Sequence, residues 1–251
     1  MIEARRLGHA VGSRPILRAM DFDVKENDFV LIFGPNGAGK STLMKILAGA
    51  LRATAGEVLL EGRNVAHCSR RELAARMSFL PQADEFSLPL LVRDVLLAGR
   101  YPYRSLFKGL GDRDRELFAS AVERFRLQGL LQRNIQTLSG GERKKVLLAC
   151  SFIQDVPLIL LDEPLNFLDP ESSLHLTRAL AEMHRDGKTI VVVAHEIERF
   201  FPFATKMLAL KSGEKIYFGD KVFSRELLRE VYRVDFQKIA LAKREIIFVN
   251  E

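Results

Sequence analysis

The sequence predicts an α/β protein with a mainly parallel sheet and an inserted helical region. Strand-sized runs that are apolar at every position alternate with helical stretches along the chain. Such runs suit strands that are buried on both faces of a parallel sheet. Between Pro81 and Pro157 no run of this kind occurs, and helical stretches take its place. The strand-sized runs lie at residues 28–33, 57–62, 77–81, 157–162, 189–195 and 206–211.

Three stretches between Pro81 and Pro157 are predicted to be helical: residues 92–99, residues 112–125 and a segment that begins after Ser139. In the last of these, apolar residues recur at positions i, i+3, i+4 and i+7, which predicts an amphipathic helix that packs one face. Those apolar positions are Val146, Ala149, Cys150 and Ile153.

The composition indicates a globular chain that remains in the cytosol. It has 251 residues, of which 47% are hydrophobic, enough for one large domain or two closely joined lobes. No apolar run approaches the roughly 18 residues of a membrane span, and the first residues lack the apolar stretch of a secretory signal. The two cysteines, Cys68 and Cys150, show neither metal-ligand nor redox spacing, so both are expected to be reduced.

The formal net charge is +6, but the basic residues are scattered among 32 acidic ones. Short clusters such as Arg70-Arg71 do not form a stripe with interleaved aromatic residues, so no nucleic-acid partner is expected. A solvated basic surface explains this charge, and proximity to anionic lipid headgroups is the alternative.

Residues 34–42, "GPNGAGKST", have the pattern of a phosphate-binding loop between a strand that ends at Phe33 and a helical stretch. The three glycines allow the backbone N–H groups to turn inward around a triphosphate. Lys40 is expected to reach the β- and γ-phosphates, and the Ser41 hydroxyl to bind Mg²⁺. The predicted nucleotide-binding residues are Gly34, Pro35, Asn36, Gly37, Ala38, Gly39, Lys40, Ser41 and Thr42.

An acidic pair follows the buried strand run 157–162. Asp162 ends that run and is expected to hold Mg²⁺, and the adjacent Glu163 is placed to polarise the water that attacks the γ-phosphate. The alternative is that the two acidic residues simply cap a strand. Because they follow a phosphate-binding loop at a spacing that allows intervening strands, the magnesium and catalytic roles are favoured.

Two further strand ends carry polar side chains that suit the same site. His195 ends the run 189–195 and can contact the γ-phosphate and orient Glu163, although a lone histidine there also fits an ordinary polar strand end. Gln82 follows the run 77–81 and can offer an amide oxygen to Mg²⁺ or to the attacking water; taken alone it fits a surface loop.

A second helix start that suits phosphate lies at residues 138–146, "LSGGERKKV". Ser139 and Glu142 have the spacing of a capping box, which by itself requires no ligand. A capping box does not explain why Gly140 and Gly141 occupy the first helical positions, where glycine costs about 1 kcal/mol relative to alanine. Two residues without side chains at a helix N-terminus permit close approach by an anion.

In this order, "GPNGAGKST", Gln82, "LSGGERKKV", "LDEP" and His195 resemble the ATP-binding cassette (ABC) ATPases over most of residues 1–220. The resemblance implies a P-loop NTPase core with an N-terminal antiparallel β region. It also implies that ATP and Mg²⁺ bind between two head-to-tail copies, with Ser139, Gly140 and Gly141 contacting the γ-phosphate held by the other copy. Residues 165–169, "LNFLD", match the loop that crosses this interface, with Asp169 at its acidic position.

The resemblance divides the single 1–251 domain into parts. Residues of about 1–87 and 156–220 form the RecA-like core with the β region, about 88–155 the helical subdomain, and about 221–251 a C-terminal extension without a predicted structure.

The sequence departs from the family pattern at three places. Glu142 stands where glutamine is frequent, and both residues complete a capping box. Val11 occupies the position of the aromatic residue that stacks on adenine, which leaves His9 as the candidate substitute. Residues 194–200, "AHEIERF", differ from the His-Asp-Leu-Asn pattern common among importers.

Residues 88–107 and the segment 231–235, "VYRVD", are similar to the iron-siderophore, haem and cobalamin importer ATPases. The likeness implies an ATP-hydrolysing subunit on the cytoplasmic face of the cell membrane, with a transmembrane permease and a substrate-binding protein as partners. Tyr101, Tyr103 and Phe107 either contact that permease or belong to the core. A soluble cassette ATPase of the iron–sulfur assembly type and an exporter cassette remain alternatives.

Overall fold

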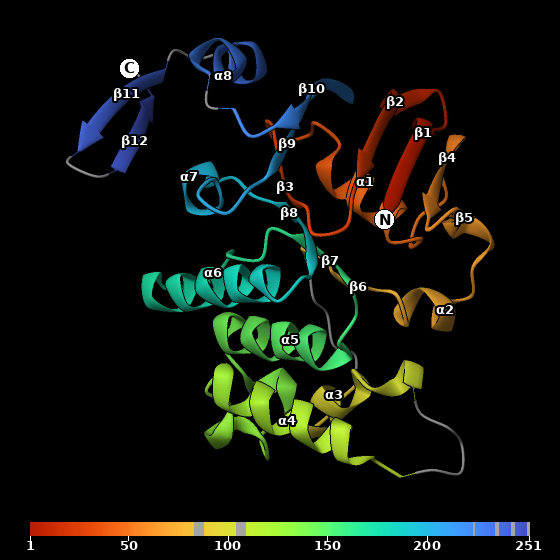
Figure 1. The fold of residues 1–251 in the computed structure, drawn as a ribbon, viewed down its shortest axis with the longest axis vertical. Helices are drawn as coiled ribbons and strands as arrows, with labels where there is room; N and C mark the ends of the chain where they lie inside the picture. The colour runs from red at the N-terminus through yellow and green to blue at the C-terminus, as the bar shows by residue number, and fades with distance from the viewer. Residues whose placement is uncertain (83–87, 104–108, 223, 234–235, 242–243, 250–251) are drawn as a thin grey trace.

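The computed structural model covers the 251-residue chain, and three sheets and eight α-helices make up the part that it describes (Figure 1). The described residues are 1–82, 88–103, 109–222, 224–233, 236–241 and 244–249.

The central sheet has six strands in the order β10-β9-β3-β8-β7-β6. The five strands from β9 to β6 run parallel, and β10 pairs antiparallel with β9 at the edge. The predicted parallel sheet is therefore confirmed. The strands are β3 (Phe29–Phe33), β6 (Met77–Leu80), β7 (Leu158–Asp162), β8 (Thr189–Val193), β9 (Lys206–Lys211) and β10 (Glu214–Asp220).

A second sheet, entirely antiparallel, has the order β2-β1-β4-β5. The run 57–62 forms a strand as predicted, but in this sheet instead of the parallel one, so its expected place was wrong. Val58, Leu59 and Leu60 are all buried, so the strand lacks the alternation that marks most antiparallel strands. The strands are β1 (Ile2–Val11), β2 (Arg14–Val24), β4 (Ala55–Leu60) and β5 (Arg63–Asn64).

Helix α1 lies against one face of the central sheet and α6 against the other, and α3, α4 and α5 form the group that Figure 1 shows at the foot of the molecule. All three helical stretches predicted between Pro81 and Pro157 are present. The helices are α1 (Lys40–Leu47), α2 (Arg70–Ala74), α3 (Val92–Ala98), α4 (Asp112–Arg124), α5 (Gly140–Gln154), α6 (Pro170–Arg185), α7 (Ile197–Phe200) and α8 (Arg225–Tyr232). A hairpin, β11 (Phe236–Leu241) and β12 (Arg244–Val249), follows α8.

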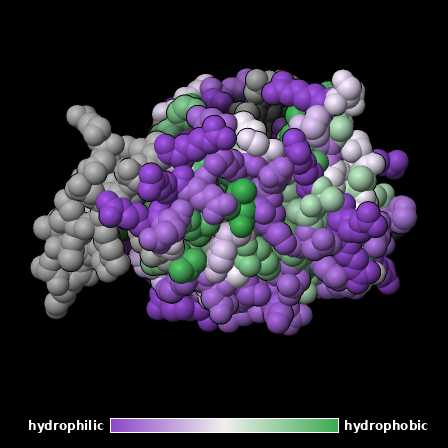
Figure 2. All heavy atoms as spheres, turned by 90° about the horizontal axis from the view of Figure 1, so that it is seen from above, coloured by the Kyte–Doolittle hydropathy of each residue, from purple (hydrophilic) through white to green (hydrophobic). Residues whose placement is uncertain are grey.

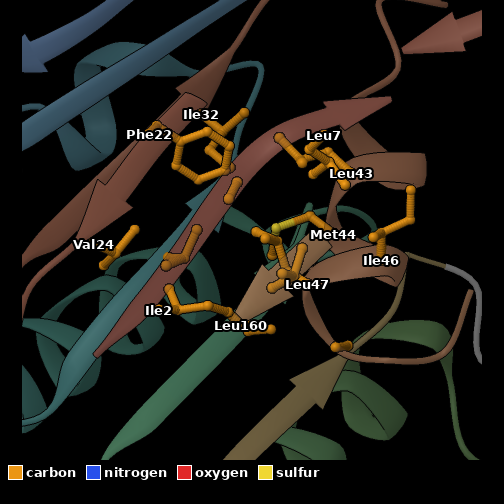
Figure 3. Packing of buried hydrophobic residues seen from close by; sticks show 14 of the residues in the cluster. Ile2, Leu7, Phe22, Val24, Ile32, Leu43, Met44, Ile46, Leu47 and Leu160 are labelled. Carbon is orange, nitrogen blue, oxygen red and sulfur yellow. The ribbon is translucent and has the colours of Figure 1, made fainter. Parts of the chain in front are cut away.

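The core consists of three clusters, and strand β7 separates two of them. Leu158 and Leu160 point into the cluster between α1 and the antiparallel sheet, which Figure 3 shows in part. Ile159 and Leu161 point to the other face, where α5 and α6 contribute Leu148 and other apolar side chains. Alternate β7 residues therefore face opposite layers, so α1 and α5 cover opposite faces of this strand.

The third cluster holds the helices α3, α4 and α5 together through apolar side chains such as Val95, Ala121 and Val146. A nearly buried ion pair, Arg100 Nε to Asp114 Oδ1 at 2.6 Å, supports it. This cluster is distinct from the two that β7 separates, and the division into a core and a helical subdomain stays a prediction.

In the described part of the chain, no helix is both long and apolar enough to span a membrane. The face in Figure 2 is largely hydrophilic, with scattered hydrophobic side chains. Cys150 packs in the helical group, and burial raises the pKa of its thiol to about 11, so the prediction of a reduced packing residue fits its surroundings.

Candidate active site

The loop 34–39 turns back on itself between β3 and α1, and two of its glycines are required sterically. Gly34 has φ +150°, and a Cβ there would lie 2.0 Å from the carbonyl oxygen of Leu210. Gly39 has φ +95°, and a Cβ there would lie 3.0 Å from the carbonyl oxygen of Ile16. Only glycine satisfies both the left-handed conformation and the close approach at these positions.

Lys40, at the start of α1, closes this loop from inside. Its buried ammonium group donates hydrogen bonds to the carbonyl oxygens of Gly34, at 2.8 Å, and Pro35, at 3.0 Å. Burial lowers the pKa of Lys40, while the nearby carboxylates of Glu163 and Asp162 act in the opposite direction. The loop and its lysine thus form a positively charged turn of the kind that binds phosphate.

Asp162 ends β7 as a fully buried carboxylate. Neither of its oxygens accepts a hydrogen bond of ordinary length, and burial raises its pKa. The Ser41 hydroxyl lies close enough to lower that pKa in part. A buried carboxylate whose oxygens lack a hydrogen bond of ordinary length, beside a hydroxyl, is a set of oxygen atoms that suits Mg²⁺.

We expect Asp162→Asn to stabilise the chain in magnesium-free buffer at neutral pH while lowering ATP hydrolysis at least about a hundredfold. A carboxyl group whose pKa is raised by folding binds protons more tightly in the folded state. The charged form therefore destabilises the fold, and this destabilisation is complete at a pH above the folded-state pKa. Asparagine carries no charge and removes that cost.

The measurement is thermal unfolding with EDTA across pH, together with steady-state hydrolysis. The stability difference should shrink as the pH falls toward 3.8, the ordinary value for this carboxyl group. The exposed Asp23→Asn on β2 is the control. A less stable Asp162→Asn would contradict the cost assigned to this buried charge.

Glu163 is the centre of a hydrogen-bonded group that brings predicted residues together. Its Oε1 lies 2.7 Å from His195 Nε2, and its Oε2 accepts a hydrogen bond from Gln82 Nε2 at 2.7 Å. The side-chain amide of Asn166 also donates to Oε2, a contact that no sequence pattern predicts. Glu163 has φ +51°, and its N–H donates a hydrogen bond to Val193 O at 3.0 Å. The backbone therefore holds this residue at the C-terminal ends of β7 and β8.

The capping box at the start of α5 is present as predicted. The Glu142 N–H donates to Ser139 Oγ at 3.2 Å, and the Ser139 N–H donates to Glu142 Oε2 at 2.9 Å. Gly140 and Gly141 face the loop before α6: added Cβ atoms would lie 3.4 Å from the Phe167 side chain and 3.3 Å from its carbonyl oxygen. The glycines thus allow that loop to lie directly against the helix start.

Asp169 caps α6: its Oδ1 accepts a hydrogen bond from the Ser172 N–H at 2.8 Å, and its Oδ2 accepts one from the Ser172 hydroxyl at 2.6 Å. These bonds lower the pKa of Asp169. Phe167, just before it, has φ +68° and is 83% exposed. The loop therefore presents a large aromatic side chain to solvent beside Ser139, Gly140 and Gly141.

Lys144 is a second residue near the candidate site that the sequence did not predict. It lies on α5 with only 4% of its surface exposed, and its ammonium group donates to the carbonyl oxygen of Pro81 at 3.2 Å. Its charge also lowers the pKa of Asp162 in part. One buried lysine thus links α5, the residue before Gln82 and the acidic end of β7.

The residues considered for adenine stacking differ in exposure. His9 is 7% exposed and its Nδ1 is buried without a hydrogen-bond partner, so its ring offers no open face to a base. Val11 is 65% exposed.

Tyr101 and Tyr103 are exposed at 66% and 44%, which excludes them from the core, whereas Phe107 lies outside the described residues.

Comparison with known proteins places these features in a family. Residues 17–166 match the family model described as ABC transporter. The iron(3+)-hydroxamate import ATP-binding protein FhuC of Bacillus subtilis is 32% identical, with 93% of this chain and 88% of that protein covered. The hemin import ATP-binding protein HmuV of Streptomyces coelicolor is 38% identical, with 88% and 79% covered.

Solved structures share the fold. A metal-chelate type ABC transporter in an inward-facing conformation matches with a TM-score of 0.81 at 24% identity, covering 99% of this chain and 96% of that one. The ATP-binding cassette MJ0796, solved as a dimer in a post-hydrolysis state with ADP and Pi, matches with a TM-score of 0.77 at 27% identity, covering 89% and 100%. The family model covers more than half of the chain, and the two relatives align along most of their length, so this chain belongs to the ABC transporter family as an ATP-binding cassette and ATPase.

Proposed function

We propose that this chain is the ATP-hydrolysing subunit of an importer for iron-siderophore, haem or cobalamin-type metal complexes. The observation that carries the ATPase role is the Glu163 carboxylate, held by His195, Gln82 and Asn166 beside the phosphate-binding loop. The import role is supported by the relatives, which are named for import of iron(3+)-hydroxamate, petrobactin and hemin.

In this proposal the backbone N–H groups of residues 34–42 and the Lys40 ammonium hold the ATP phosphates. Ser41, Asp162 and Gln82 hold Mg²⁺, which supplies charge neutralisation of the phosphates when bound. Glu163 accepts the proton of the attacking water, and its contact with Gln82 leaves the Gln82 amide oxygen available to the metal or the water. His195 keeps Glu163 in position and offers its ring to the γ-phosphate.

We further propose that hydrolysis requires two copies of the chain. In this model Ser139, Gly140 and Gly141 bind the γ-phosphate of the nucleotide held by a second copy. Phe167 and Asp169, on the loop beside these glycines, would lie at the same interface. The dimeric MJ0796 cassettes support this arrangement.

Mixing two inactive variants tests the shared site. Lys40→Ala removes the phosphate lysine of one copy, and Ser139→Arg blocks the glycine helix start of the other. Each homodimer has two damaged sites, but the mixed dimer has one undamaged site, so an equimolar mixture should recover at most about a quarter of wild-type hydrolysis under random pairing. The control doubles the protein concentration of each variant alone. A mixture no more active than its components would contradict completion of the site by a second copy.

The permease and the substrate-binding protein are proposed partners, and the cytoplasmic face of the cell membrane is the proposed location. The test is to purify the tagged chain from detergent-solubilised membranes of its own cells and reconstitute the co-purified permease in lipid vesicles with ATP on the cassette side. ATP-dependent accumulation of ferric hydroxamate or haem, but not of free iron, would support the proposal. Extrusion in the opposite direction would indicate an exporter cassette, and recovery only with soluble iron–sulfur proteins would indicate the assembly type.

A further inference from the structure

The C-terminal extension packs against the end of the central sheet at which β3 leads into the loop 34–39. Helix α8 buries Leu228 and Val231 in the cluster that also contains Phe33. Lys211, the last residue of β9, donates a hydrogen bond from its ammonium group to the Glu230 carbonyl oxygen. These contacts place the C-terminal end of α8 next to β9. Helix α8 lies outside residues 17–166, which match the family model.

Tyr232 ends α8, and its aromatic ring stacks on that of Phe33, with the ring centroids 6.4 Å apart and an angle of 24° between the planes. Phe33 is the last residue of β3 and directly precedes Gly34. Burial raises the pKa of Tyr232 to about 12, and the backbone N–H of Gly34 offsets part of that rise. The phenol is therefore neutral at physiological pH, with its oxygen facing this amide.

Gly34 also lies against β9, because a Cβ on Gly34 would lie only 2.0 Å from Leu210 O. The first residue of the phosphate-binding loop thus contacts β9 and faces Tyr232. Lys40 fixes the same residue through the Gly34 carbonyl oxygen. Of these neighbours, Tyr232 is the one supplied by the C-terminal extension.

We propose that Tyr232 is a positioning residue that holds Gly34 in place before the nucleotide arrives, so that helix α8 sets the ATP affinity of the loop. This inference rests on the proposed role of residues 34–42 in binding phosphate. A loop that is ordered in advance loses less conformational entropy on binding, and the gain is seen as affinity. Because Tyr232 meets Phe33 and Gly34, at the start of the phosphate-binding loop, it should act on binding and leave the chemical step unchanged.

Three variants separate positioning from simple packing. Tyr232→Phe keeps the ring on Phe33 and removes the hydroxyl that faces Gly34. Tyr232→Leu removes the aromatic ring as well. Tyr217→Phe is the matched control, because Tyr217 is another partly buried tyrosine of the same cluster whose hydroxyl donates to the Asp220 carbonyl oxygen at 2.7 Å.

The dissociation constant is measured with a fluorescent ATP analogue, KM and kcat by steady-state hydrolysis, and folding by thermal unfolding without nucleotide. We expect Tyr232→Phe to weaken binding about fivefold, the effect of losing one ordinary hydrogen bond. Tyr232→Leu should weaken it about tenfold or more. In both variants KM should rise with the dissociation constant, kcat at saturating ATP should stay within about twofold, and Tyr217→Phe should bind ATP as the wild type does.

A packing role predicts a different result. A partly unfolded variant loses active molecules, which lowers the apparent kcat and the unfolding midpoint but leaves KM unchanged. Wild-type affinity in Tyr232→Phe and Tyr232→Leu would overturn the inference and leave the proposed ATPase role intact. If Tyr232→Leu fails to fold, Tyr232→Phe alone decides. A wild-type chain that does not bind ATP would overturn both proposals.

Discussion

Glu163→Gln should lower ATP hydrolysis about a thousandfold while ATP binding is retained. The carboxylate accepts hydrogen bonds from Gln82 and Asn166 and contacts His195, so it is held where a water beside the γ-phosphate can give up its proton. Glutamine has the same shape but cannot accept that proton. ATP should then remain bound and hold two copies together, so a dimer should accumulate.

The measurements are steady-state hydrolysis, equilibrium binding of ATP and the molecular mass in solution with and without ATP. Glu214→Gln on β10 is the matched control, because Glu214 is an exposed carboxylate in an ion pair with Arg18 at 3.2 Å and is expected to leave all three measurements unchanged. Hydrolysis near the wild-type rate would exclude Glu163 as the general base. A variant that binds ATP and remains monomeric would argue against the two-copy model.

Lys40→Ala should weaken ATP binding about a hundredfold or more, since hydrogen bonds from a charged group to phosphate are each worth about 1.5–3 kcal/mol. The loss should arise from missing contacts with the ligand and not from unfolding. Burial lowers the pKa of Lys40, so removing this buried charge offsets the lost hydrogen bonds to Gly34 and Pro35. The unfolding midpoint without nucleotide should therefore change by only a few degrees.

Lys45→Ala provides the control, because Lys45 is exposed in the last turn of the same helix, α1, and alanine favours helix there. Both variants are titrated with ATP in the presence and absence of Mg²⁺. Equal affinity of the Lys40→Ala and Lys45→Ala variants for ATP would show that the buried lysine is not the phosphate ligand.

The parts of the fold that could be predicted are the strands whose run of apolar residues indicates burial on both faces. Strands β3, β7, β8 and β9 are buried on both faces, and their uninterrupted apolar runs predicted them. Strand β4 has a similar run, yet it lies in the antiparallel sheet because the pattern reports burial and not the pairing partner. Strands β1 and β2 were not predicted from their residues, since register shifts between them break the regular alternation.

Some residues of the candidate site could likewise be recognised only from their contacts in the folded chain. Asn166 and Lys144 were missed because an asparagine in a loop and a lysine on a helix are ordinary residues until their contacts are known. Tyr232 faces Gly34 from 198 positions further along the chain, which no local pattern can report. His9 was suggested as a base-stacking residue from its position in the sequence, but its side chain is buried in the folded chain.

The amino-acid sequence by itself determined the features that depend on neighbouring residues: the phosphate-binding loop, the capping box of Ser139 and Glu142, and the acidic pair after a buried strand. Their geometry is set by backbone conformation within a few residues, so the pattern is sufficient. Only the tertiary structure decided that Gln82 and His195 meet at Glu163, and that α1 and α5 lie on opposite faces of β7. Those contacts join segments that are distant in sequence, and packing of the whole sheet brings them together.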